Sequence, residues 1–172
     1  MTRFEMMPGD YIAEDLAKIV TLVSDYTNTK KVYLAAPWFD EKARMLHDTV
    51  ALIDNYLGDK SRYSIYYPKD NNKDTPFNTF KSNIEAIHDC DIVIALISRK
   101  DVGTAWEIGY ASAIEKPVYL VTYSEECFKS KTNLMLAYSG KCFTIDKLAK
   151  FLTVGLDSVD YIQIERMWED VE

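Results

Sequence analysis

The chain has 172 residues, of which 48% are hydrophobic and 27% charged, proportions that are ordinary for one globular domain with its own core. A net charge of −7 and the lack of a long basic cluster argue against nucleic-acid binding through phosphate contacts. Cys90, Cys127 and Cys142 show neither paired nor metal-binding spacing, so we expect reduced thiols in a cytoplasmic protein.

The N-terminal segment MTRFEMMPGD lacks the apolar run of a signal peptide. No later segment approaches the ~18 consecutive apolar residues of a membrane span, so we expect no membrane association. The two histidines, His47 and His88, lie in polar helical surroundings, which predicts surface side chains for both.

Prolines, glycines and polar runs divide the chain into alternating helices and strands. A first helix is predicted over 11–26, as part of a helical extension (1–30) that precedes a single α/β domain (31–172). Strands are predicted at 31–36, 63–67, 91–97, 117–123 and 141–145. Further helices are predicted at 40–57, 77–89, 101–115, 145–152 and 159–168, with loops at 69–76 and 124–131.

Short apolar strands that alternate with longer helices favour a parallel sheet with right-handed crossovers. We predict an α/β, flavodoxin/Rossmann-like fold, with a doubly wound, five-stranded parallel sheet and helices on both faces. Ligands of such sheets bind beyond the carboxyl ends of the strands, at the topological switch point. The polar and aromatic residues expected at these ends are Tyr33, Trp38, Phe39, Asp70, Asn71, Asn72, Asp101 and Asn133.

Aromatic rings together with amides and carboxylates suit a flat, polar-edged base and a sugar better than a bare phosphate. The chain contains no P-loop and no GxGxxG motif, and Gly103 and Gly109 are too sparse to cradle a pyrophosphate. Nucleotide-triphosphate and dinucleotide chemistry are therefore poor fits.

The segment Asp101–Tyr110 carries the strongest functional signal. Glu107 is the only charged residue between Asp101 and Glu115, and at helical spacing it lies on an apolar face. A carboxylate on such a face is costly unless it is hydrogen-bonded or paired, which makes Glu107 a candidate catalytic residue. The alternative is a glutamate that only complements the helix dipole.

Four blocks of sequence, in this order, resemble the nucleoside 2-deoxyribosyltransferases, which exchange the base of a 2′-deoxynucleoside. They are VYLAAPWF at 32–39, YYPKDNN at 66–72, DVGTAWEIGYA at 101–111 and NLM at 133–135. The resemblance covers about 31–152, and the third block is the most specific. It implies a nucleotide-salvage enzyme that binds deoxynucleosides and free nucleobases, uses no metal or organic cofactor, and forms a homo-oligomer with shared active sites.

The resemblance also implies residue roles. Glu107 falls on the family's nucleophile, within its D-x-G-x-x-x-E pattern, and Tyr33 on the tyrosine that orients it. Asp101 falls on the aspartate that binds the sugar hydroxyls, whereas Asn133 and Met135 match residues that a neighbouring subunit lends to the site. The alternatives are a core aromatic for Tyr33 and a helix-capping aspartate for Asp101. Trp38, Phe39 and Gly103 are the further residues expected to contact substrate.

The chemistry of base exchange suits a carboxylate at Glu107. Displacing a base from C1′ passes through an oxocarbenium-like state, which a carboxylate can capture covalently before a second base attacks with net retention. We expect the positive end of the helix to help keep Glu107 ionised.

The chain departs from the family at Asn72 and Asn83, where many members have a glutamine and an aspartate that contact the base. Asn83 can hydrogen-bond a base edge, but it cannot act as a general acid. The donor of the proton to the leaving base therefore stays open, with Asp70 as the alternative acid and Asp91 expected to be structural.

Two rival functions remain. Related enzymes use the same glutamate to cleave nucleoside 5′-monophosphates with water as the acceptor. Asp101 would repel a phosphate at that place, although Arg99 and Lys100 nearby reduce this repulsion. The other rival is a non-catalytic nucleotide-binding module, which the combination of Glu107, Tyr33 and Asp101 disfavours.

Overall fold

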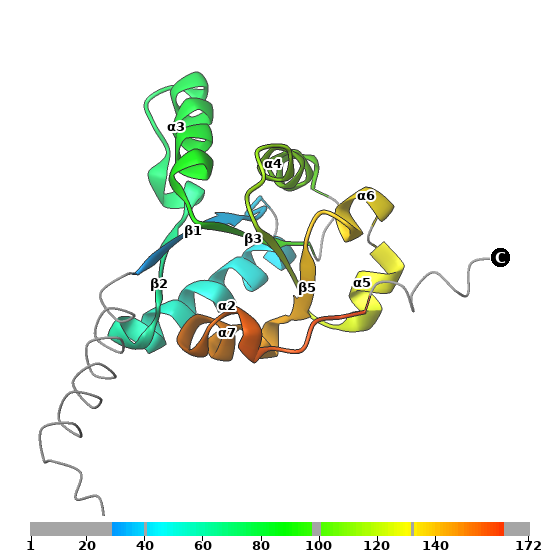
Figure 1. Ribbon diagram of the computed structural model, residues 1–172. Coiled ribbons are helices and arrows are strands. Elements are labelled where there is room, and N and C mark those ends of the chain that lie inside the picture. Colours follow the sequence, from blue (N-terminus) through cyan, green and yellow to red (C-terminus); the bar gives the residue numbers. More distant parts are fainter. Residues whose placement is uncertain (1–28, 40, 98–100, 132, 164–172) are drawn as a thin grey trace, which may run out of the picture.

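The structure is a computed structural model that describes residues 29–39, 41–97, 101–131 and 133–163. Five parallel strands form one sheet in the order β2-β1-β3-β4-β5 (Figure 1). Their bounds are Lys30–Ala35 (β1), Tyr63–Tyr66 (β2), Ile92–Leu96 (β3), Val118–Thr122 (β4) and Lys141–Thr144 (β5). This architecture confirms the predicted α/β fold with a five-stranded parallel sheet.

Helices cover both faces of the sheet (Figure 1). Helices α2 (Glu41–Leu57) and α7 (Leu148–Val154) lie on one face, and α3 (Pro76–Asp89) and α4 (Val102–Ala113) lie on the other. Two short helices, α5 (Glu125–Lys131) and α6 (Leu134–Ala137), connect β4 to β5. Single 3₁₀ turns occur at Gly58–Lys60, Pro68–Asn71, Ile145–Lys147 and Leu156–Ser158.

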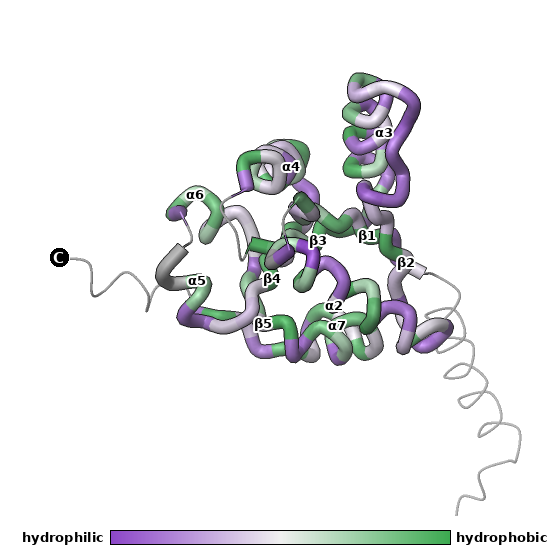
Figure 2. The backbone as a smooth tube through the Cα atoms, turned by 180° about the vertical axis from the view of Figure 1, so that it is seen from behind, coloured by the Kyte–Doolittle hydropathy of each residue, from purple (hydrophilic) through white to green (hydrophobic). Residues whose placement is uncertain are grey.

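The central strands are buried on both sides, as their uniformly apolar sequences require. All five residues of β3 are buried, and Figure 2 shows this strand as a hydrophobic band inside the molecule. In β1, alternate side chains enter different cores: Val32 and Leu34 face α2 and α7, whereas Tyr33 and Ala35 face α3 and α4. This alternation turns Tyr33 toward the helix that carries Glu107.

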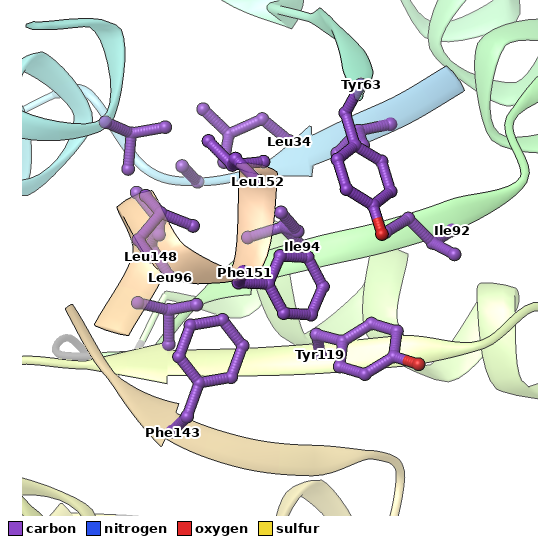
Figure 3. Close-up of a cluster of buried hydrophobic side chains, with 14 of the residues drawn as sticks. Leu34, Tyr63, Ile92, Ile94, Leu96, Tyr119, Phe143, Leu148, Phe151 and Leu152 are labelled. Atoms are coloured by element: carbon purple, nitrogen blue, oxygen red, sulfur yellow. The ribbon is translucent and has the colours of Figure 1, made fainter. Parts of the chain in front are cut away.

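Aromatic and branched side chains fill the core beneath α7 (Figure 3). Phe151 of α7 stacks on Phe143 of β5, with ring centres 5.0 Å apart, and packs edge-on against Tyr119 of β4. The other labelled side chains of this cluster are Leu34, Tyr63, Ile92, Ile94, Leu96, Leu148 and Leu152.

The strand order creates a switch point between β1 and β3. The chain leaves β1 through α2 on one face of the sheet and leaves β3 toward α4 on the other face. The two connections diverge at the carboxyl edge, which is where sheets of this order bind ligands. Tyr33 and the start of α4 both lie beside this point.

Several predicted boundaries need correction. The predicted loop at 124–131 contains α5, because the Ser124 hydroxyl accepts a hydrogen bond from the Cys127 N–H and caps the helix. The helix predicted at 159–168 is wrong over residues 159–163, where the Ile162 N–H donates to the Cys142 carbonyl and runs the chain beside β5. The rest of that helix, the helix predicted at 11–26 and Asp40, where the helix predicted at 40–57 begins, lie outside the described residues.

The prediction of a surface position is wrong for His47. The residue is 3% exposed, and its ring packs edge-on against Tyr67, because this part of α2 faces the sheet. His88 is exposed, as predicted. Over the described part of the chain, no helix combines the length and the apolar character needed to cross a bilayer.

Gly140 permits a close approach between two backbones at the edge of β4. A Cβ atom at this position would lie 2.3 Å from the Val118 carbonyl oxygen, a distance that the backbone must move to relieve. We expect Gly140→Ala to lower the free energy of unfolding by roughly 1–3 kcal/mol in urea denaturation. Gly109→Ala is the control: its added Cβ would have no atom within 4 Å outside its own helix backbone and its chain neighbours, so the helix should gain up to about 1 kcal/mol. Equal effects of the two substitutions would contradict this explanation.

Candidate active site

A tyrosine of the sheet and a glutamate of a helix meet at the switch point. Tyr33 is fully buried in β1, and its hydroxyl donates a hydrogen bond of 2.6 Å to Glu107 Oε1 in the second turn of α4. The two residues are 74 positions apart in the chain, so only the fold brings them together. The structure thus joins the predicted nucleophile to the side chain predicted to orient it.

The surroundings of Glu107 weaken its acidity. Burial raises the pKa of its carboxyl to about 7; the hydrogen bond from Tyr33 acts in the opposite direction, and the negative charge of Asp101 adds to the rise. Burial thus disfavours the charged form of this carboxyl. The expected help from the positive end of the helix stays a prediction. Burial and Glu107 also raise the pKa of Tyr33, so its hydroxyl remains protonated.

Asp101 caps the helix that carries Glu107. Its Oδ2 accepts a hydrogen bond of 2.6 Å from the Thr104 N–H, as the alternative interpretation from the sequence anticipated. A Cβ on Gly103 would lie 3.2 Å from the same oxygen, so the glycine leaves room for the capping carboxylate. Capping fixes Asp101 beside the site, and its role in sugar binding stays a prediction.

A second tyrosine, which the sequence interpretation missed, lies beside Tyr33. Tyr66 of β2 is the register partner of Tyr33, and their rings stack with centres 5.7 Å apart and planes 15° from parallel. The Tyr66 hydroxyl lies 3.1 Å from the Ser82 hydroxyl of α3, and either oxygen can be the donor. The pair of strand-end tyrosines was visible in the sequence, but their register and the helical partner of Tyr66 were not.

The two asparagines at which we expected a departure from the family pattern lie in different environments. Asn83 stands one helical turn before the buried Ile87, and its Oδ1 is buried without a hydrogen-bond partner among the described residues. Asn72 is exposed, and its Nδ2 donates to the Lys69 carbonyl at 3.2 Å. Asn83 therefore lies on the inner side of α3 with a free acceptor, whereas Asn72 belongs to the outer rim.

Aromatic side chains border the site on two sides. Trp38 and Phe39 follow β1, with ring centres 5.1 Å apart, and Phe39 is 75% exposed. Between α3 and α4, Trp106 packs against Phe80 and stacks on Tyr110, the second pair with ring centres 5.2 Å apart. This second group did not figure among the predicted site residues.

Helix α6 presents an exposed apolar surface next to α4. Asn133 caps the helix, because its Oδ1 accepts a hydrogen bond of 2.8 Å from the Met135 N–H. The Met135 side chain is 76% exposed, and Leu134 and Tyr138 beside it are also exposed. We call Leu134, Met135 and Tyr138 the α6 patch. Within this chain, Asn133 and Met135 make no described contact with Glu107.

Charged residues near the site give no metal centre in the described part of the chain. No three histidine, cysteine, aspartate or glutamate side chains gather there in a way that could hold a metal ion. Arg99 and Lys100, which entered the argument about phosphate, lie outside the described residues.

Comparisons with known proteins place these features in one family. The sequence model of the nucleoside 2-deoxyribosyltransferase family matches residues 32–140. The chain is 28% identical to the 2-deoxyribosyltransferase of Bacillus psychrosaccharolyticus, with a TM-score of 0.56, over 66% of this chain and 85% of that one.

Two further solved structures are similar. The 2-desoxiribosyltransferase of Leishmania mexicana is 24% identical, with a TM-score of 0.54, over 74% of this chain and 99% of that one. The CMP N-glycosidase of Clostridium botulinum is 25% identical, with a TM-score of 0.50, over 73% of this chain and 98% of that one. No curated protein matches the chain.

The raised pKa of Glu107 predicts a measurable effect on stability. A carboxyl whose pKa is higher in the folded state, here about 7 against 4.5, destabilises the fold progressively as the pH rises between these values. Glu107→Gln removes this charge, so its free energy of unfolding should exceed that of the wild type by on the order of 2 kcal/mol at pH 8. The difference should vanish near pH 4.5.

Urea denaturation at several pH values measures this difference. Glu85→Gln is the control, because Glu85 is exposed on α3 and its ion pair with Lys81 lies on the surface. It should change stability little at any pH. A Glu107→Gln variant that is no more stable than the wild type at pH 8 would contradict the raised pKa.

Proposed function

The chain belongs to the nucleoside 2-deoxyribosyltransferase family, and on this premise we propose that it exchanges the base of a 2′-deoxynucleoside through a covalent deoxyribosyl–Glu107 intermediate. The hydrogen bond of 2.6 Å between Tyr33 and Glu107 is the observation that carries the proposal. It holds one carboxylate oxygen at the switch point and leaves the other for C1′ of the sugar.

The first step is the displacement of the base. The C1′–N bond breaks, its electron pair leaves with the base, and a carboxylate oxygen of Glu107 bonds to C1′. The burial that raises the pKa also leaves the ionised carboxylate poorly solvated, so it gains more from the positive charge that develops on the sugar. A second base then attacks C1′ from the face that the first base left. The bond between C1′ and Glu107 breaks, its electron pair returns to the carboxylate, and the anomer is retained.

Other side chains have roles that follow from their positions. Tyr33 is a positioning residue whose hydrogen bond fixes the carboxylate and partly offsets the effect of burial on its pKa. Asp101 is proposed to bind a sugar hydroxyl, and Asn83 to hydrogen-bond the base. Trp38 and Phe39 are proposed to contact the base. Asn72, which is exposed and donates a hydrogen bond to the Lys69 carbonyl, is proposed to contact the substrate at the outer rim of the site.

The alternative is an N-glycosidase that uses water as the acceptor. The similarity to a CMP N-glycosidase favours it. Against a 5′-monophosphate as the substrate stands Asp101, whose carboxylate already occupies the amino end of α4, the place where a helix would otherwise attract a phosphate. We therefore favour substrates with a free 5′-hydroxyl.

Incubation of the protein with a 2′-deoxynucleoside, with and without a free acceptor base, tests the function. We expect a new deoxynucleoside when the acceptor is present. Release of free deoxyribose as the main product would assign the protein as an N-glycosidase, and the absence of any reaction would indicate a non-catalytic binding protein.

Glu107→Ala should abolish exchange, because it removes the nucleophile. A 2-fluoro sugar analogue should add its sugar mass to the peptide that contains Glu107, and Glu107→Ala with near-normal turnover would exclude the covalent mechanism.

We also propose a homo-oligomer in which Asn133 and Met135 complete the site of a neighbouring subunit. An exposed apolar surface such as the α6 patch is a liability on a monomer, whereas a partner would cover it. Mixing Glu107→Ala with Asn133→Ala subunits should then restore activity above either parent, because some mixed oligomers regain one intact site. A monomer in sedimentation that is fully active would contradict the shared site.

A further inference from the structure

The leaving base requires a proton, and the amide of Asn83 cannot supply one. We propose that the hydroxyl pair Tyr66–Ser82 gives this proton to the leaving base and recovers it from the incoming base. The proposal rests on the proposed base-exchange function and adds the acid that this function lacks.

The placement of Tyr66 carries the proposal. Tyr33 and Tyr66 are partners in neighbouring parallel strands, so their side chains leave the same face of the sheet near its carboxyl edge. Their stacked rings are 5.7 Å apart, and each hydroxyl ends at a different helix: Tyr33 at Glu107 of α4, and Tyr66 at Ser82 of α3.

The neighbouring groups suit a base between the two helices. Tyr66 and Ser82 are half-buried, so water reaches the pair only in part. Asn83, the residue after Ser82, offers a buried acceptor oxygen with no partner among the described residues. The hydroxyl pair can donate and the Asn83 oxygen can accept, and a nucleobase carries partners for both kinds of group.

The proton balance closes over one exchange. As the C1′–N bond breaks and Glu107 bonds to C1′, the Tyr66 hydroxyl gives its proton to the departing base. The Ser82 hydroxyl then donates a hydrogen bond to the Tyr66 phenolate. When the acceptor base attacks C1′ and the bond to Glu107 breaks, the attacking nitrogen loses its proton to the phenolate, which restores Tyr66.

The other acidic groups near the site are less suited. Tyr33 already donates to Glu107, and Asp101 accepts the capping hydrogen bond of α4. Asp70 is exposed in the 3₁₀ turn after β2, on the rim with Asn72. His88 is exposed and bonded to Tyr110.

Two matched pairs of substrates separate proton transfer from other effects. In each pair the second base leaves with less need of a proton: 2′-deoxyguanosine with 7-methyl-2′-deoxyguanosine, and 2′-deoxyuridine with 5-fluoro-2′-deoxyuridine. The informative pair is the one whose first member the enzyme accepts as a substrate. For that first member, Tyr66→Phe should lower the rate of base exchange by on the order of 100-fold. For the second member the loss of rate should be far smaller, and this contrast should be largest in the 7-methyl pair, because 7-methylguanine leaves without any proton.

Three further variants sharpen the test. Tyr67→Phe is the control, because Tyr67 adjoins Tyr66 but donates to Asp54 from the opposite core; it should affect both members of a pair equally and weakly. Ser82→Ala should cause the same substrate-selective loss of exchange rate as Tyr66→Phe, but a smaller one. Asn83→Asp in the Tyr66→Phe background should recover much of the lost rate, because an aspartic acid at this position can protonate the base.

Each outcome decides the proposal. An equal loss on both members of a pair in Tyr66→Phe would make Tyr66 a structural residue and overturn it. A substrate-selective loss in Asp70→Asn but not in Tyr66→Phe would assign the acid to Asp70 instead. If the wild type exchanges none of the four substrates, base exchange itself fails, and the proposal with it; a wild type that exchanges them while Tyr66→Phe is unchanged overturns this proposal alone.

Discussion

The hydrogen bond between Tyr33 and Glu107 is the contact around which the candidate site is built. It joins a central strand of the sheet to a helix on one face. Without it, the Glu107 carboxylate would lack this hydrogen-bond donor in its largely buried position. The apolar strands β1 and β3 bring Tyr33 to this depth, and the Asp101 cap fixes the start of α4. Sheet, helix start and carboxylate therefore depend on one another.

The same burial links stability to reactivity. Taking the Glu107 carboxyl from water raises its pKa to about 7, which means that its charged form costs the fold some stability at neutral pH. A poorly solvated carboxylate also interacts more strongly with a developing positive charge. Tyr33 moderates this cost with one hydrogen bond, and its own raised pKa keeps it a donor.

Helix α3 adds the second side of the site. Its only buried residue in the described structure is Ile87, its Ser82 hydroxyl meets the Tyr66 hydroxyl of β2, and its Asn83 carries a buried amide oxygen. The chain thus places a carboxylate on α4, and a hydroxyl and an amide on α3, beside two stacked tyrosine rings.

The sequence by itself determined the alternation of strands and helices, because burial on two faces forces apolar runs such as 92–96. It singled out Asp101 and Glu107 through one short pattern, and Tyr33 through a separate block at 32–39. It missed the helix at 125–131, whose cap is a single serine, and the burial of His47. Only the tertiary structure decided that Tyr66 stands beside Tyr33, that Asn83 lies inside while Asn72 lies on the rim, and that burial raises the pKa of Glu107. Register, solvation and contacts between distant segments depend on how the elements pack, and local sequence patterns carry no record of that packing.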